Sequence, residues 1–243
     1  MRRLLFCISL AAVLSLAALP AAPAGGFPEV WRAGTVVSDE AVAEAGLDRC
    51  FVVEEVGDAV FSRMRGKSWA PGCTLRRGQL RYLRLLHRNM EGRAQLGEMV
   101  VNAAIAADVA HVFRRLYEAG YRIGRMVLID DYGADDEASM RANNTTCFNF
   151  RFQTGSRTRV SKHGMGLAVD INPLYNPYVR RRRNGMFHVE PSTGRKYAFR
   201  RDGRSDIPCK IDRNDLAYKL FTEAGFKWGG AWRSVKDYQH FEK

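Results

Sequence analysis

The sequence predicts an α+β protein, in which a small antiparallel sheet carries helices packed on it. Three observations predict this class. The 243 residues are 46% hydrophobic and 26% charged, as in a globular protein. Helical periodicity dominates the first half of the chain, and short apolar or alternating segments typical of strands dominate the second half. The length suits one sizeable domain with an added flank.

The N-terminal segment has the pattern of a secretory signal peptide. Arg2 and Arg3 precede an apolar stretch at residues 4–19, and Ala22-Pro23-Ala24 resembles a cleavage site. The apolar stretch is short for a bilayer span of about 20 residues. We therefore expect an exported protein, periplasmic or extracellular, with no stable membrane span once the signal is removed. The expected parts are a signal peptide at 1–24, an N-terminal flanking segment at 25–74 and the main domain at 75–243.

Cysteine content agrees with export. Removing Cys7 with the signal leaves Cys50, Cys73, Cys147 and Cys209. An even number of cysteines in an exported protein favours one or two disulfides, with three full pairings possible and isolated buried thiols as the alternative.

The net charge of +12 favours anionic partners. For an exported protein these are acidic envelope polymers or carboxylate-rich peptides, and we expect no nucleic acid. The densest basic run, at residues 179–185, is predicted as a solvated loop because Asn184-Gly185 is a turn signal. Steering of an anionic substrate is the alternative for this run.

The predicted elements follow in chain order. The spacing of Leu80, Leu83 and Leu86 predicts a helix over 75–90, and a second helix over 97–119 ends at Gly120. Further strands are predicted at 125–130, 147–152, 166–172, 226–230 and 237–243, with a short helix at 135–144. A helix over 211–226 has Asp212 as its expected N-cap and Gly225 at its C-terminal end.

A histidine and an aspartate flank two glycines near the middle of the chain. His163 precedes a predicted strand and Asp170 lies within it, while Gly164 and Gly166 allow the backbone to turn sharply between them. A catalytic zinc site takes three His or carboxylate ligands and keeps one position open. These two residues therefore suggest a zinc site that needs a third ligand.

His240 is the natural third ligand. It lies in a terminal predicted strand, whereas His87 and His111 lie on predicted helices and His188 in a basic loop. Asp237 stands three residues before it and is the candidate general base, which later donates the proton to the leaving amine. Spacing alone leaves open a core histidine and a turn-capping aspartate.

Two motifs resemble a known family. The pattern S-x-H-x-x-G-x-A-x-D is followed near the end of the chain by D-x-x-H-F. The residues concerned are Ser161, His163, Gly166, Ala168, Asp170, Asp237, His240 and Phe241. Together with SMRANNTTCFNFR, DINPLYNPYV and GFKWGGAWRSVKDYQHFE, they resemble the zinc D-alanyl-D-alanine carboxypeptidase and L-alanyl-D-glutamate endopeptidase family, which cleaves the stem peptides of bacterial peptidoglycan.

The resemblance implies a site and a fold. His163, Asp170 and His240 would hold one Zn²⁺ per chain, with Asp237 as the catalytic base, in the hedgehog-like zinc D,D-peptidase fold. The family's upstream arginine motif is missing, and Arg151 is the substitute candidate for holding the substrate, with a surface arginine as the alternative.

Two further side chains are candidates near the metal. Ser161 is expected to hydrogen-bond a ligand and fix its orientation, or simply to serve as a turn hydroxyl. Trp232 is a candidate for the wall of the substrate cleft, whereas Trp228 is expected in the core.

Several functions follow as hypotheses. The first is a zinc peptidase of stem peptides, with D,D-carboxypeptidase activity ahead of L-alanyl-D-glutamate endopeptidase activity. The second is a non-catalytic, zinc-containing cell-wall binding module. The third is a basic envelope scaffold in which these histidines and aspartates are incidental.

Overall fold

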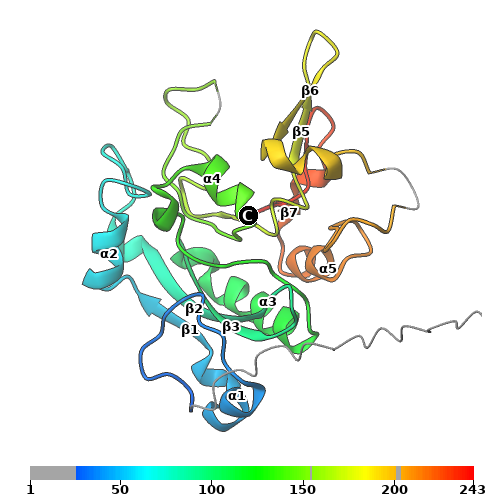
Figure 1. The fold of residues 1–243 in the computed structure, drawn as a ribbon. Coiled ribbons are helices and arrows are strands. Elements are labelled where there is room, and N and C mark those ends of the chain that lie inside the picture. Colours follow the sequence, from blue (N-terminus) through cyan, green and yellow to red (C-terminus); the bar gives the residue numbers. More distant parts are fainter. Residues whose placement is uncertain (1–25, 154, 201–203) are drawn as a thin grey trace, which may run out of the picture.

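Short antiparallel sheets and helices pack around one large apolar cluster and smaller ones in the computed structural model, which describes residues 26–153, 155–200 and 204–243 (Figure 1). The helices are α1 (Asp39–Ala45), α2 (Asp58–Met64), α3 (Ala106–Glu118), α4 (Asp136–Arg141) and α5 (Leu216–Glu223). The strands are β1 (Phe51–Glu55), β2 (Leu80–Arg88), β3 (Ala94–Asn102), β4 (Ala168–Asp170), β5 (Tyr178–Arg181), β6 (Phe187–Glu190), β7 (Lys227–Trp228), β8 (Lys236–Asp237) and β9 (His240–Glu242). This mixture of helices and small antiparallel sheets is compatible with the predicted α+β class.

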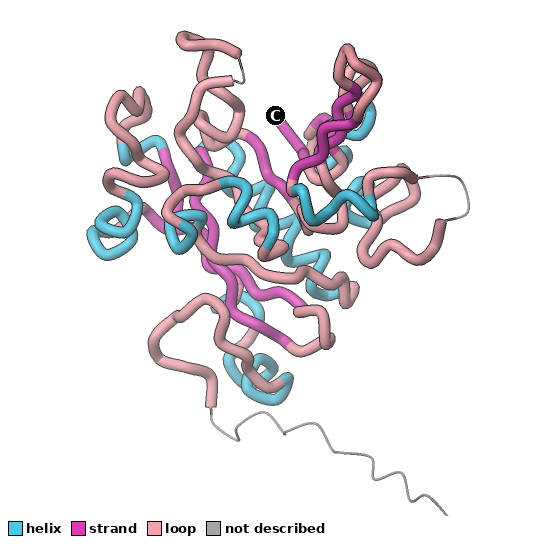
Figure 2. Tube along the Cα trace, turned by 45° about the horizontal axis from the view of Figure 1, so that its top comes forward, coloured by secondary structure: helices cyan, strands magenta, loops and turns pink. Residues whose placement is uncertain are grey.

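The strands form three antiparallel sheets of three strands each among the described residues. Their orders are β1-β2-β3, β4-β9-β7 and β6-β5-β8. Figure 2 shows the longer strands of the first sheet and the short strands of the C-terminal part, which are joined by long loops. β1 belongs to the predicted flanking segment and pairs with β2 from Phe51↔Leu85 to Glu55↔Arg81. The division of the chain at residues 74 and 75 stays a prediction.

Helix α3 links the first sheet to the C-terminal sheets. It packs on β1 and β2 on one side and on α5 on the other. Phe113 of α3 meets Phe221 of α5 edge to face at 6.2 Å, and Phe221 stacks on Phe241 of β9 at 4.6 Å. These three rings are at most 1% exposed. The face of strand β9 that carries Phe241 therefore packs into the same apolar cluster as the first sheet.

The predicted helix over 75–90 is wrong, because this segment contains strand β2. Its residues alternate between two buried faces: Leu83 and Leu85 pack toward α3, whereas Leu80 and Tyr82 pack toward Phe148 and its neighbours. A strand that is buried on both faces shows no clean polar alternation, so its apolar spacing also satisfied a helical pattern.

The predicted helix over 97–119 is wrong in its first part. Residues up to Asn102 belong to strand β3, and the Asn102 side chain accepts a hydrogen bond from the Ala104 N–H at 3.0 Å. This cap begins a helical turn that leads into α3. The end near Gly120, which has a positive φ of 70°, is as predicted.

Two predicted strands do not form. Residues 125–130 and 147–152 contain isolated bridges, such as Arg125↔Asn144, and the first segment ends in a 3-10 turn at Ile129–Tyr132. Part of the backbone pairing near Val127 is taken by the Asn144 side chain, which accepts from the Val127 N–H at 2.9 Å and donates to its carbonyl at 3.1 Å. A side-chain amide thus replaces a neighbouring strand.

The remaining predictions in the C-terminal half fare better. Helices α4 and α5 and strands β4 and β7 form where they were predicted, whereas the single strand predicted over 237–243 is divided into β8 and β9, which belong to different sheets. The N-cap of α5 is Asp215 rather than Asp212, because the Asp215 carboxylate accepts from Ala217 and Tyr218. The basic run at 179–185 is not simply a loop: it forms part of β5 and then a hairpin turn at Gly185.

The structure describes the four cysteines that follow the predicted signal peptide, but not the signal peptide itself. Cys50, Cys73, Cys147 and Cys209 are free thiols, so the predicted disulfide is not found among the described residues. Residues 1–25, which contain the predicted signal peptide, lie outside the described residues. Across the part that is described, none of the helices combines the length and the apolarity needed to span a membrane.

Candidate metal centre and catalytic site

A tight turn positions His163. The Ser161 hydroxyl accepts a hydrogen bond from the Gly164 N–H at 2.9 Å, and the Gly166 N–H donates to the His163 carbonyl at 2.9 Å. Gly166 has a φ of +65°, and a Cβ there would lie 2.8 Å from the Asn102 nitrogen. A side chain at residue 166 would therefore be strained and would clash. Ser161 acts on this turn, which is the turn-hydroxyl alternative.

Cross-strand pairing places Asp170 beside His240. The two residues are direct partners in the β4–β9 ladder, and their neighbours Val169 and Phe241 pair on the opposite face, where both are fully buried. Directly opposed residues point to the same face of a sheet. The core contact behind the strands therefore fixes both candidate ligands on the other side.

The three predicted ligands converge. His163 Nε2 lies 3.1 Å from His240 Nδ1 and 3.3 Å from an Asp170 oxygen, and His240 Nδ1 lies 3.1 Å from the other Asp170 oxygen. All candidate ligand atoms lie within 4.8 Å of one another. The side chains are nearly inaccessible to solvent. The structure thus brings together the residues that the sequence selected from distant positions.

The outer nitrogen of each imidazole is already engaged. His163 Nδ1 lies 2.8 Å from the Cys147 carbonyl, and His240 Nε2 lies 3.2 Å from a Glu242 carboxylate oxygen. Both partners only accept hydrogen bonds, so these nitrogens carry the proton of the neutral ring. When both rings are neutral, two lone pairs would then face each other and the Asp170 carboxylate. A cation would satisfy this arrangement, and two histidines with a carboxylate suit zinc.

The electrostatics of the cluster also favour a cation. Burial by itself lowers the pKa of His240, but its hydrogen bonds to Asp170 and Glu242 and the negative charges of Asp170 and Asp237 raise it to about 10. Burial raises the pKa of Asp170, yet the neighbouring imidazoles outweigh burial and hold that pKa well below its usual range. Positive charge is therefore favoured at this cluster even though it is buried.

Asp237 lies beside the converging ligands without joining them. Gly229 permits this approach, because a Cβ there would lie 2.7 Å from the Asp237 carbonyl oxygen and 3.2 Å from the His240 Cβ. The buried Asp237 Oδ1 makes no hydrogen bond with any described residue. Burial raises the pKa of Asp237 to about 6, although His240 opposes that rise. A carboxylate with such a pKa is suited to accept and return a proton near neutrality.

The other sequence candidates lie as follows. The Trp232 ring centroid is 5.3 Å from that of His240, so Trp232 borders the site. Arg151 Nε lies 2.6 Å from an Asp136 oxygen, which engages its guanidinium with α4. Trp228 is 8% exposed and lies in the core, as expected.

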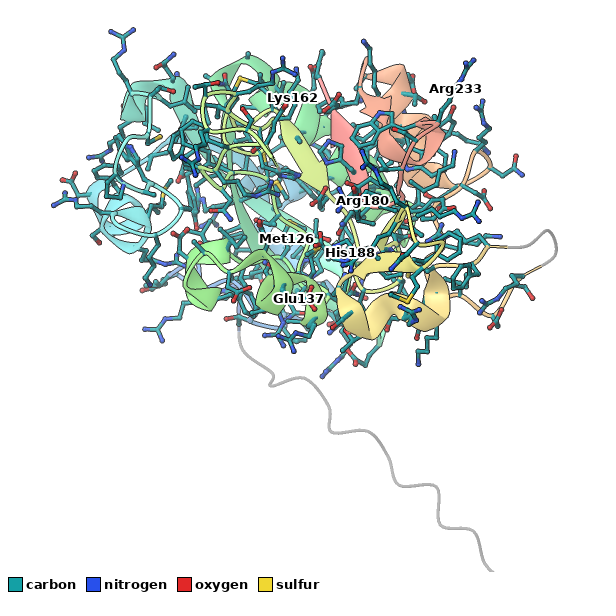
Figure 3. The ribbon with its side chains drawn as sticks, turned by 90° about the horizontal axis from the view of Figure 1, so that it is seen from above. Met126, Glu137, Lys162, Arg180, His188 and Arg233 are labelled. Atoms are coloured by element: carbon teal, nitrogen blue, oxygen red, sulfur yellow. The ribbon has the colours of Figure 1, made fainter. Side chains whose placement is uncertain are left out.

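A small pocket opens beside Asp237. It has a volume of about 140 Å³, and an adjoining larger hollow of about 640 Å³ shares His188 and Glu190 with it. The small pocket is lined by Tyr178, Arg180, His188, Glu190, Asp237 and Gln239. Figure 3 shows Arg180 and His188 close together near the middle of the molecule, with Glu137 on the side of the larger hollow.

Sequence reasoning missed the groups that orient the ligands. Glu242 lies two residues after His240 in the same strand, and this period of two was the available signal. Asn172, two residues after Asp170, is fully buried with a φ of 47°. Its side chain accepts from the Gly124 N–H at 2.9 Å and donates to the Arg122 carbonyl at 2.9 Å. It thereby ties the end of the ligand strand to a distant loop.

Comparisons with known proteins agree with this site. Residues 154–243 match a family model described as D-alanyl-D-alanine carboxypeptidase. The matched segment contains His163, Asp170, Asp237 and His240. Searches of curated proteins and of solved structures gave no match. The family match confirms that the C-terminal part of the chain resembles the zinc D-alanyl-D-alanine carboxypeptidase family.

Proposed function

We propose that this protein is an exported zinc peptidase that hydrolyses the stem peptides of bacterial peptidoglycan. D,D-carboxypeptidase activity is the first specificity proposed. The observation that carries the proposal is the convergence of His163 Nε2, His240 Nδ1 and the Asp170 carboxylate beside the buried Asp237 Oδ1, which has no hydrogen-bond partner among the described residues. The hedgehog-like zinc D,D-peptidase fold and export through residues 1–24 belong to the same proposal.

The chain's own residues would divide the chemistry between them. His163, Asp170 and His240 would hold one zinc ion, which when bound supplies a Lewis acid that polarises the scissile carbonyl and lowers the pKa of the attacking water. Asp237 accepts the proton from that water and returns it to the leaving amine as the C–N bond breaks. Trp232 covers one side of His240 and helps to exclude bulk water.

A second specificity has its own support. The hollow beside the small pocket leaves room for a chain that continues past the cleaved bond, which suits an L-alanyl-D-glutamate endopeptidase. A non-catalytic binding module is the alternative of another class. The buried Asp237 Oδ1 argues against it, because a binder gains nothing from a carboxylate oxygen left without a partner beside the metal ligands.

Metal content and cleavage products test these alternatives together. Purified mature protein is compared with Asp237→Ala, His240→Ala and the control His111→Ala, which replaces an exposed histidine on α3. We expect wild type and His111→Ala to hold about one zinc per chain and to release D-alanine from stem pentapeptides. Asp237→Ala should retain zinc without cleavage, and His240→Ala should lose zinc.

The other outcomes each reject part of the proposal. Internal cleavage of the stem in place of D-alanine release establishes the endopeptidase. Zinc binding without cleavage of any stem peptide establishes the binding module. A wild-type protein that holds no zinc refutes the metal site and leaves the basic scaffold, whose binding to anionic envelope polymers can then be measured.

A further inference from the structure

One face of the sheet β6-β5-β8 carries Asp237 together with several polar side chains. Tyr178 is the cross-strand partner of both Asp237 and Glu190, and Arg180 is the partner of His188. Partners and alternate residues share a face of a sheet. The residues between them in β5 and β6 point the other way into a small apolar cluster. The register therefore places Arg180 on the same face as the candidate base.

The pocket on this face has the size of a small chemical group. Its volume of about 140 Å³ leaves room for several water molecules. It joins the larger hollow through His188 and Glu190. A substrate group next to the reacting bond can therefore enter the pocket while the rest of the chain runs outward.

Most charged groups along this wall are already paired. The Arg182 guanidinium donates to His188 Nδ1 at 2.9 Å, so the proton of that ring lies on Nε2, which donates to Glu190 at 2.6 Å. This chain of contacts engages one cation and one anion. Arg180 differs, since it makes no ion pair or hydrogen bond with any described residue and its side chain is exposed. It is the unengaged cation among the residues that line the small pocket.

Arg151 is less suited to hold an anionic substrate. Its guanidinium is already 2.6 Å from Asp136. A new anion there would have to displace a carboxylate, whereas an anion at Arg180 would displace only water.

We propose that Arg180 binds a carboxylate of the substrate and so determines which stem peptides reach the site. This inference rests on the proposed peptidase function and adds to it the residue that selects an acidic substrate. A guanidinium binds a carboxylate through two parallel hydrogen bonds, which fixes position as well as charge. The carboxylate has two sources in a stem peptide: the C-terminal D-alanine, or the free α-carboxylate of D-glutamate.

Equilibrium binding to metal-depleted protein tests the inference without turnover. Fluorescent stem pentapeptides are titrated in three forms: unmodified, with a C-terminal amide, and with D-isoglutamine in place of D-isoglutamate. The proteins are wild type, Arg180→Gln, Arg180→Lys, Arg151→Gln and the control Arg181→Gln, whose side chain alternates to the other face of β5. Circular dichroism checks that each variant is folded.

Removing the recognised carboxylate from the peptide and removing the guanidinium of Arg180 from the protein should weaken binding of the peptide equally. We expect Arg180→Gln to weaken binding of the unmodified peptide about 10- to 100-fold. Wild type should bind one of the two amidated peptides equally weakly, and that peptide identifies the source. Arg180→Gln should not discriminate between the forms, Arg180→Lys should fall between, and Arg181→Gln should resemble wild type. With zinc restored, Arg180→Gln should raise KM by a similar factor at unchanged zinc content.

Failure of the inference differs from failure of the function. If wild type cleaves stem peptides and Arg180→Gln has the same KM and Kd, the role of Arg180 is refuted and the peptidase stands. Loss of carboxylate discrimination in Arg151→Gln instead assigns the role to Arg151. If wild type neither binds nor cleaves any form, the proposed function and this inference both fall.

Discussion

The contact between Glu242 and His240 predicts how tightly the site holds its metal. Glu242 Oε2 lies 3.2 Å from His240 Nε2, and its side chain is 24% exposed. The hydrogen bond to His240 lowers the pKa of Glu242, so the carboxylate is charged near neutral pH. Partners that orient a ligating imidazole typically contribute about 10- to 100-fold in metal affinity. Glu242→Ala should therefore raise the zinc Kd by that factor, or about 1.4–2.7 kcal/mol.

A second substitution separates orientation from charge. Glu242→Gln keeps an oxygen that accepts from His240 Nε2 but loses the negative charge, so its zinc affinity should fall between those of wild type and Glu242→Ala. Glu223→Ala is the control, because it removes an exposed surface carboxylate that pairs with Arg115.

The assay is competition for zinc against a chelator of known affinity at constant pH. Thermal unfolding of the zinc-free proteins is measured alongside, so that a change in stability is not mistaken for a change in affinity. A Kd for Glu242→Ala within twofold of wild type would refute the reasoning, as would a larger loss in Glu242→Gln than in Glu242→Ala.

Three other substitutions test the surroundings of the site. Asn172→Ala should lower the free energy of unfolding, measured in urea, by about 3–5 kcal/mol, because buried hydrogen bonds are lost and alanine is strained at this positive φ. Asn172→Gly should recover about 1 kcal/mol of that loss, because glycine adopts this φ without strain. A loss below 1 kcal/mol in Asn172→Ala contradicts the prediction. Gly229→Ala should displace Asp237 and lower kcat about tenfold or more while zinc content is retained; an unchanged kcat contradicts it. Burial raises the pKa of Asp215 to about 6. Folded protein thus holds this proton more tightly than unfolded protein, and stability is lost as the carboxyl ionises between about pH 4 and 6. Asp215→Asn, which keeps an N-cap oxygen, should gain up to about 3 kcal/mol over wild type on going from pH 4 to pH 7.5 in urea unfolding, and a pH-independent difference contradicts it.

The candidate site was more predictable than the fold around it. His163, Asp170, Asp237 and His240 lie in two short motifs whose residue types suit zinc chemistry, and the structure brings the three predicted ligands together with Asp237 beside them. Spacing alone left a core histidine and a turn-capping aspartate open, and the resemblance of the two motifs to a zinc peptidase family selected these four residues. Their neighbours were less visible, because Glu242 becomes a partner of His240 only through the strand geometry.

The first half of the chain was mispredicted for a physical reason. Strand β2 is covered by α3 on one face and by the segment around Phe148 on the other, so its apolar spacing did not distinguish a strand from a helix. The position of Arg180 beside the site could not be predicted either. The basic run at 179–185 was interpreted as a loop, and a loop gives no strand register from which to infer which residues share a face. Only the tertiary packing shows that residues 80–88 form a strand and that Arg180 lies on the face of β5 that carries the pocket.

The stack of Phe113, Phe221 and Phe241 has a consequence for dissecting the protein. The family match begins at residue 154, yet Phe241 lies against α5, which in turn lies against α3 far upstream. A fragment cut at the boundary of sequence similarity would leave these aromatic faces in water and would lack the neighbour against which Gly166 is fitted. The segment that similarity recognises is therefore smaller than the packed core to which it belongs, and the motifs around His163 and His240 rest on residues that the family match does not cover.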